Sequence, residues 1–258
     1  DASPRLVGGW SFAQGGANDP PWDGFGDGRF FLPRWTYERT GQGTTLTAAV
    51  DLRDGWTGRV RLARAELETV WDALRRAPHE SRPPRVTYVD HVEREAYAAG
   101  VHEITDAIAR GELTKVVAVR RAVVHTDRDL DPGSVLRTLS ASYPGTWRFG
   151  VRFGAGTFVA ATPERLFSKR GRTVQVDALA GSIAAGPTDA EARLAASEKN
   201  LREHRPVVEH LLARLGPLCH HLESPGAPQV RRLPNVLHLH TPLGGTLREG
   251  VEATTLVE

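Results

Sequence analysis

Two charged residues in this chain are placed where a general base and a general acid could operate. Lys115 opens the apolar run Lys-Val-Val-Ala-Val, and Glu164 follows the apolar strand pattern of residues 157–162. A lysine in a desolvated site can act as a base when a proton donor faces it across the substrate, and Glu164 is the candidate donor. Two alternatives stay open: a strand-end lysine usually keeps its ammonium group in water, and Glu164 could pair with Arg165 or Lys169.

A third charged residue, Glu203, lies on the apolar stripe of a predicted helix. Val207 and Leu211 follow it at i+4 and i+8, so its carboxylate points the same way as they do. A carboxylate in such a place requires a cation, which could be a metal ion, Lys199 one turn earlier or a nearby arginine. Pro206 should kink this helix or mark its first turn, and the sequence leaves both possibilities open.

Small residues end one of the predicted strands. The strand at residues 172–179 runs into Ala-Leu-Ala-Gly-Ser at 178–182, where the lack of side-chain bulk leaves room for a ligand close to the backbone. Farther along, His238 and His240 share one face of a predicted strand. No cysteine or acidic residue stands beside them at metal-ligand spacing, which disfavours a zinc site.

The elements around these residues predict an α+β fold with large, mostly antiparallel sheets and flanking helices, because many strands form hairpins and helices are inserted between them. Residues 1–31, rich in glycine and aromatic residues, are predicted to be an ordered, irregular layer. Strands are expected at residues 34–39, 44–52, 86–89, 115–124, 147–153, 157–162, 172–179 and 236–241. Helices are expected at residues 62–74 (ending before Pro78), 97–108 (closed by Gly111) and 132–143, and between residues 188 and 219.

Composition narrows the class of protein. The 258 residues are predicted to form a single domain. The 33 Lys and Arg residues are spread through the chain and nearly balanced by 31 Asp and Glu, so the chain lacks the basic patch of a nucleic-acid binder. One cysteine, Cys219, rules out an internal disulfide, and no apolar run reaches the length of a membrane span. We therefore expect a cytoplasmic protein. The absence of Met and the uncapped end at residues 255–258 lead us to expect a chain that is longer at both ends.

Taken together, these segments resemble the chorismate-utilising enzymes and, within them, the isochorismate synthases. Five ordered motifs over residues 111–241 carry the resemblance, and residues 1–110 match more loosely. The motifs are Gly-Glu-Leu-Thr-Lys-Val-Val-Ala-Val-Arg at 111–120, Ala-Thr-Pro-Glu-Arg-Leu at 161–166, Ala-Leu-Ala-Gly-Ser at 178–182, Ser-Glu-Lys-Asn-Leu-Arg-Glu-His at 197–204 and His-Leu-His-Thr at 238–241.

The resemblance implies a fold like that of anthranilate synthase component I and an Mg²⁺-dependent conversion of chorismate to isochorismate. Lys115 would activate the water that attacks ring carbon 2, Glu164 would protonate the hydroxyl that leaves carbon 4, and Glu203 would bind Mg²⁺. A lysine at this position also distinguishes the water-adding members of the family from the ammonia-using anthranilate synthases. The substrate would be held by Ala180, Gly181, Ser182, His238 and Thr241.

Departures from the family pattern set the limits of this expectation. Asn200 stands where an aspartate is common, Ala118 replaces a leucine, and the family's carboxy-terminal third has no counterpart, so we expect an incomplete fold. The favoured function is an isochorismate synthase of the menaquinone or siderophore type, and a monomer. A salicylate synthase and a non-catalytic chorismate-binding fragment are the alternatives.

Overall fold

The computed structural model describes the chain except residues 1–4, 52, 54–55, 77–81, 92–93 and 258. The chain forms two compact units, one of residues 1–82 with 151–158 and the other of residues 83–150 with 159–258. All the residues singled out for chemistry belong to the second unit. Whether the chain acts as one functional domain stays a prediction.

The first unit contains two small antiparallel sheets and a long helix. β1 (Val7–Trp10) pairs with β2 (Gly28–Phe31), β3 (Trp35–Thr40) pairs with β4 (Gly43–Ala48), and α1 spans Trp56–Arg75. The prediction that residues 1–31 are irregular is thus wrong for β1 and β2, whose pairing across the intervening loop leaves no local signal. Leu52 and Pro78, which bounded the predicted strand and helix, lie outside the described residues.

A five-stranded antiparallel sheet is the centre of the second unit. Its strand order is β11 (Cys219–Glu223), β13 (Val236–Leu247), β10 (Thr173–Ala184) and β9 (Ser168–Arg170), and β12 (Gln229–Arg232) also pairs with β13. The predicted strands at 172–179 and 236–241 ended too early. β10 continues past Gly181 through an irregularity in its pairing, and β13 continues through Pro242, because pairing between these two long strands overrides the local breaker signals.

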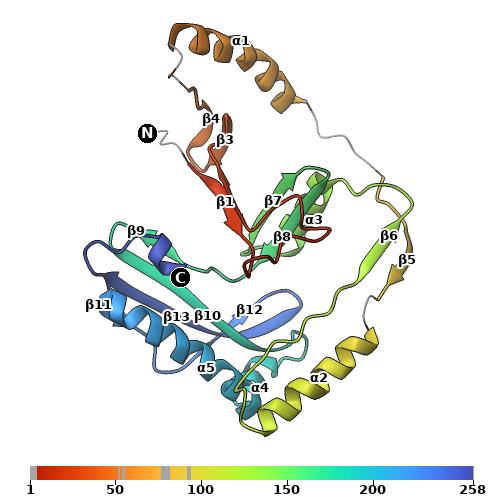
Figure 1. The fold of residues 1–258 in the computed structure, drawn as a ribbon, viewed down its shortest axis with the longest axis vertical. Helices are drawn as coiled ribbons and strands as arrows, with labels where there is room; N and C mark the ends of the chain where they lie inside the picture. Colours follow the sequence, from red (N-terminus) through yellow and green to blue (C-terminus); the bar gives the residue numbers. More distant parts are fainter. Residues whose placement is uncertain (1–4, 52, 54–55, 77–81, 92–93, 258) are drawn as a thin grey trace. The chain divides into compact units, whose positions relative to one another are not determined.

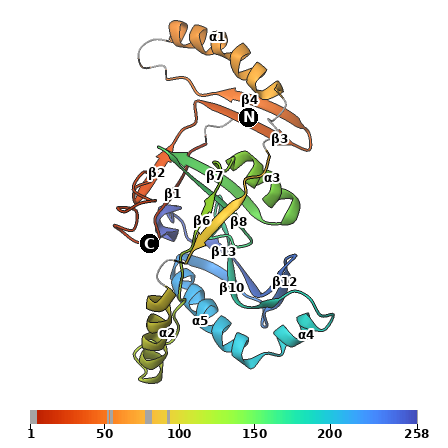
Figure 2. The same cartoon turned by 90° about the vertical axis from the view of Figure 1, so that its right-hand side faces the viewer.

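The two faces of this sheet differ in character. Along β13, buried residues alternate with half-buried ones as far as Gly244, and the buried face carries Leu237, Leu239 and Leu243. Helices α4 (Ala190–Ala195) and α5 (Glu198–Leu215) pack on the apolar side of the sheet, and α5 runs along β10 and β13 (Figures 1 and 2). Each fully buried leucine contributes about 1.5–3 kcal/mol to folding.

The start of α5 is fixed by a cap. Ser197 is the N-cap residue, and its Oγ accepts a hydrogen bond from the backbone N–H of Asn200. The helix continues through Pro206 to Leu215, so Pro206 lies in the helix interior and not in its first turn. The ambiguity left by the sequence is thereby removed.

The rest of the second unit contains helices α2 (Arg94–Ala109) and α3 (Pro132–Ser142), the pair β5 (Val86–Asp90) and β6 (Val123–Thr126), and parts of the hairpin of β7 (Trp147–Phe153) and β8 (Gly156–Thr162). The strand predicted at residues 115–124 is wrong for most of its length, since residues 115–122 are in no strand or helix. Val117 and Val119 are 71% and 84% exposed. In the described chain no neighbouring strand pairs with them, and a β-prone run without a ladder forms no strand.

The α+β prediction with mostly antiparallel sheets is confirmed by this arrangement. Among the residues that the structure describes, no helix is both long and apolar enough to span a membrane.

Candidate functional site

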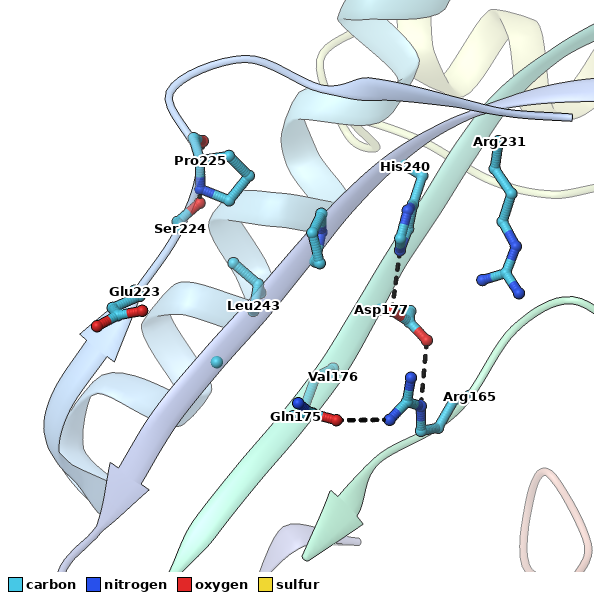
Figure 3. Close-up of a pocket in the computed structure, with 12 residues that line it drawn as sticks. Arg165, Gln175, Val176, Asp177, Glu223, Ser224, Pro225, Arg231, His240 and Leu243 are labelled. Atoms are coloured by element: carbon cyan, nitrogen blue, oxygen red, sulfur yellow. Dashed lines mark hydrogen bonds and ion pairs between the residues drawn. The ribbon is translucent and has the colours of Figure 1, made fainter.

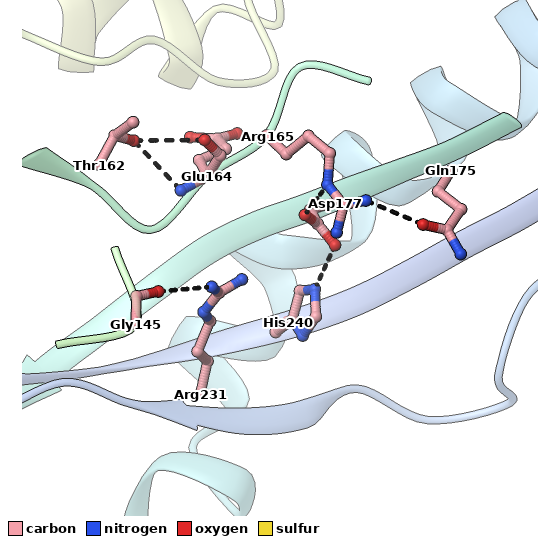
Figure 4. A network of polar contacts seen from close by, with 8 residues as sticks. All are labelled: Gly145, Thr162, Glu164, Arg165, Gln175, Asp177, Arg231 and His240. Atoms are coloured by element: carbon pink, nitrogen blue, oxygen red, sulfur yellow. Dashed lines mark hydrogen bonds and ion pairs between the residues drawn. The ribbon is translucent and has the colours of Figure 1, made fainter. Parts of the chain in front are cut away.

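Glu164 lies in the short connection between β8 and β9 and is flanked by two anchors. On one side, its own backbone N–H donates to Thr162 Oγ1 at 3.1 Å. On the other, Arg165 reaches across to β10, where its Nε donates to Asp177 Oδ2 at 3.3 Å and its Nη1 to Gln175 Oε1 at 2.9 Å (Figure 4). The backbone that carries Glu164 is therefore tied down immediately before and after it.

The surroundings of Glu164 favour its protonated form. Loss of solvent around the carboxyl raises its pKa above the usual value, the negative charge of Asp177 raises it further, and the positive charge of Lys115 opposes both. Lys115 is partly buried and comes from the irregular segment before β6. Residues 49 positions apart thus come within electrostatic reach of each other, and their types are those of a base and an acid.

Asp177 is a buried acid that the sequence reasoning did not single out. Its side chain is 7% exposed, and besides Arg165 it contacts His240, whose Nε2 lies 2.9 Å from Asp177 Oδ1 (Figure 3). A signal was present, because an acidic residue between Val176 and Ala178 in an apolar strand is unusual. From the sequence, His240 was considered only as a zinc ligand. Arg165 was considered only as an ion-pair partner of Glu164.

Two cavities lie beside this network. One, of about 650 Å³, is lined by Glu164 and Arg165 with the aromatic rings of Trp147 and Phe149. The other, of about 490 Å³, is lined by Arg165, Asp177 and His240, and Gln175 borders both. Their sizes suit a small organic ligand. Lys115, Ser182 and His238 do not line either of these two cavities.

The predicted substrate residues Gly181, Ser182 and His238 meet at the irregular pairing between β10 and β13. Ser182 Oγ lies 2.6 Å from His238 Nδ1, and the Ser182 N–H donates to Asn200 Oδ1 at 3.0 Å. Gly181 has φ +77°, and a β-carbon there would lie 3.0 Å from the Asn200 carbonyl oxygen. The small size of Gly181 therefore allows helix α5 to approach strand β10 closely. The pKa of His238 is lowered by burial and by the charge of Arg231.

Thr241 lies on the other face of β13. It is 3% exposed, and its hydroxyl is 2.8 Å from Nε2 of the buried His204. His204 Nδ1 is 3.1 Å from the Ala180 carbonyl oxygen and must donate to it, so Nε2 accepts from Thr241. Burial lowers the pKa of His204, which favours this neutral ring. The structure thus separates Thr241 from Ser182 and His238.

Glu203, the predicted magnesium ligand, is half-exposed on α5. Its carboxylate lies 3.6 Å from Lys199 Nζ, which is the ion pair that the sequence left as an alternative. No group of three or more His, Cys, Asp or Glu side chains that could hold a metal occurs among the described residues. A hard cation such as Mg²⁺ requires several oxygen ligands, so the described side chains do not form a magnesium site by themselves.

Comparison with known proteins points to the same family as the sequence motifs. The sequence model of the family described as chorismate binding enzyme matches residues 1–258. Isochorismate synthase MenF of Bacillus subtilis is 30% identical over 268 residues, which covers 99% of this chain and 55% of that protein. The chain thus spans about half the length of this curated relative.

Two solved structures resemble the fold. The menaquinone-specific isochorismate synthase MenF of Escherichia coli has a TM-score of 0.76 at 24% identity, covering 90% of this chain and 55% of that one. Anthranilate synthase component I of Streptococcus pneumoniae has a TM-score of 0.70 at 18% identity, covering 89% and 53%. The predicted likeness to the anthranilate synthase component I fold is confirmed, and the chain spans about half of each of these structures.

Proposed function

The chain belongs to the chorismate binding enzyme family, and we propose that it carries the acid and the base of an isochorismate synthase. The observation that supports this most directly is the electrostatic coupling of Lys115 to Glu164, together with the raised pKa of Glu164. Two titratable groups from separate segments, one able to accept a proton and one held in its protonated form, are what a reaction with one proton removed and one proton added requires.

The proposed reaction exchanges one hydroxyl group for another. Lys115 takes a proton from a water molecule as its oxygen bonds to ring carbon 2 of chorismate. The ring double bonds shift, the bond between carbon 4 and its hydroxyl breaks, and Glu164 gives that hydroxyl a proton so that it leaves as water. Water enters and water departs, so the product, isochorismate, is an isomer of the substrate.

The substrate is proposed to lie between this pair and the bend of β10. Ser182 and His238 are hydrogen-bonded to each other and remain partly accessible, so they can present a hydroxyl and a ring nitrogen to the ligand. The backbone of Ala180 and Gly181 borders the same bend. Thr241 would support this region from beneath, through His204, and would not touch the ligand itself.

Glu203 is the residue that we propose as a ligand of magnesium. Bound Mg²⁺ would neutralise substrate carboxylate charge, and Glu203 would be one of its ligands. No step is assigned to the metal, because no group of three or more His, Cys, Asp or Glu side chains that could hold it occurs among the described residues. A monomeric state and a cytoplasmic location stay predictions.

Incubation with chorismate and Mg²⁺, followed by chromatographic identification of the product, tests the function. Isochorismate supports the proposal. Salicylate with release of pyruvate would replace it by the salicylate synthase alternative. Chorismate binding without any product, measured on the whole encoded protein, would support the non-catalytic chorismate-binding alternative. This alternative is tested because the chain covers only 55% of the Bacillus subtilis relative.

A further inference from the structure

The network around Asp177 reaches beyond the residues assigned so far. Arg165 is the residue directly after Glu164, and its guanidinium spans Asp177 and Gln175 on β10. With the bond from the Glu164 N–H to Thr162, these contacts hold the connection between β8 and β9 at both ends. A side chain in a connection of this kind can keep one position only if neighbouring residues fix the backbone.

Burial of Asp177 makes the attachment stiff. A carboxylate that is 7% exposed must stay paired, and here Arg165 and His240 each occupy one of its oxygens (Figures 3 and 4). If Arg165 left, Asp177 would keep only His240 as a partner. Because losing one partner of a buried charge is strongly unfavourable, the Arg165 side chain has little freedom to move.

We propose that Asp177, acting through Arg165, is a positioning residue that holds Glu164 in place as the proton donor. This rests on the proposed function of Glu164. His240 and Gln175 complete the device, because the first orients the Asp177 carboxylate and the second gives the Arg165 guanidinium its second anchor.

The charges that face Glu164 agree with this assignment. Asp177 on β10 and Lys115 from the segment before β6 act in opposite directions on the pKa of Glu164, and Arg165 and Arg170 line the same cavity. Asp177 therefore has two consequences for Glu164. It fixes where the carboxyl lies, and it favours the protonated form that a donor needs.

The first experiment replaces Asp177 by Asn and follows the Glu164 carboxyl by ¹³C NMR as pH is varied, with Glu164→Gln to assign the signal. Asn is nearly isosteric and carries no charge, so the Glu164 titration should move to lower pH. This measurement needs no turnover. If the unmodified protein makes no isochorismate, the proposed function fails while the titration still tests the role of Asp177.

Activity separates positioning from a general loss of structure. Gln175→Ala removes one anchor of Arg165 at an exposed position, and Arg165→Lys keeps the charge without the bridging fork. Each should lower kcat about tenfold with KM changed less than twofold, because the acid is displaced while substrate contacts remain. Glu191→Gln, which removes the exposed Arg232–Glu191 pair of the same unit, is the matched control and should change neither.

Two results would overturn the assignment. One is an Asp177→Asn protein whose Glu164 titrates as in the unmodified chain. The other is a set of Gln175 and Arg165 variants whose kcat equals that of the control. If Asp177→Asn does not fold, the Gln175→Ala and Arg165→Lys variants decide the matter alone.

Discussion

Gly181 and Asn200 lie so close that a β-carbon added to the glycine would be 3.0 Å from the Asn200 carbonyl oxygen and 3.1 Å from its Cβ. The contact joins the irregular point of β10 to the first turn of α5. Asn200 adds two hydrogen bonds there, accepting from the Ser182 N–H and donating from Nδ2 to Ser197 Oγ. Asn200 thus ties strand β10 to helix α5.

Gly181→Ala should therefore destabilise the protein more than an equivalent change at an open position. Gly171→Ala is the matched control, since Gly171 also has positive φ (+58°) but has nothing within 4 Å of an added β-carbon. The strain of a β-carbon at positive φ should lower the free energy of unfolding by about 1–2 kcal/mol in both variants. Displacement of Asn200 should add about 1–2 kcal/mol in Gly181→Ala alone. Urea denaturation measures both, and equal losses would show that the contact with α5 is unimportant.

Thr241→Val tests the separation of Thr241 from the substrate region. Valine has a similar shape but lacks the hydroxyl, so the buried Nε2 of His204 loses its partner and the free energy of unfolding should fall by about 1–3 kcal/mol. KM for chorismate should stay within twofold. Thr246→Val, at an exposed position of the same strand, is the control. A raised KM with unchanged stability would return Thr241 to the substrate-binding set.

Local rules predicted what depends on local contacts. Gly111 was expected to close a helix, and it has φ +74° with the Gly111 and Glu112 N–H groups bonded to the Ile108 and Ala107 carbonyls, which is a Schellman motif. The strand at 147–153 was likewise found where alternation placed it. The strand predicted at residues 115–124 was wrong over residues 115–122, because strand formation depends on a partner strand, which an apolar run does not reveal.

The candidate site was predictable in its residue types and less so in its connections. Lys115 and Glu164 were paired by chemistry, and their coupling in the structure agrees with that pairing without testing their roles. Asp177 was missed because its partners, Arg165 and His240, are 12 and 63 positions away along the chain. Thr241 was grouped with His238 by a motif, although the alternation of β13 puts neighbours of odd separation on opposite faces.

Magnesium binding should be weak in the 258-residue chain alone. Glu203 provides one half-exposed carboxylate that is already paired with Lys199, and an ion held by one carboxylate keeps most of its water. Isothermal titration with MgCl₂ should give a dissociation constant in the millimolar range or weaker, and Glu203→Gln should change it little. Tight binding that Glu203→Gln abolishes would show that further ligands lie within these residues.

Lys115→Ala in the whole encoded protein should abolish turnover while chorismate binding persists. The lysine acts on the attacking water and not on the bound substrate, so its loss falls on kcat and leaves the dissociation constant within about threefold. Lys169→Ala, which removes a lysine of β9, is the control and should retain turnover. If binding and rate fell equally in Lys115→Ala, the lysine would hold the substrate or the fold instead of acting as the base.

Glu164→Gln should remove one limb of the pH profile. The donor must be protonated, and burial together with Asp177 raises the pKa of Glu164, so activity of the unmodified enzyme is present below that pKa and falls as pH rises through it. Glutamine cannot donate the proton, so kcat should drop by about 10²–10⁴-fold and the remaining rate should lack this alkaline limb. The profile of kcat against pH for both proteins provides the check. A variant that keeps the same limb would assign it to another group, and Glu164 would then have to be removed from the acid role.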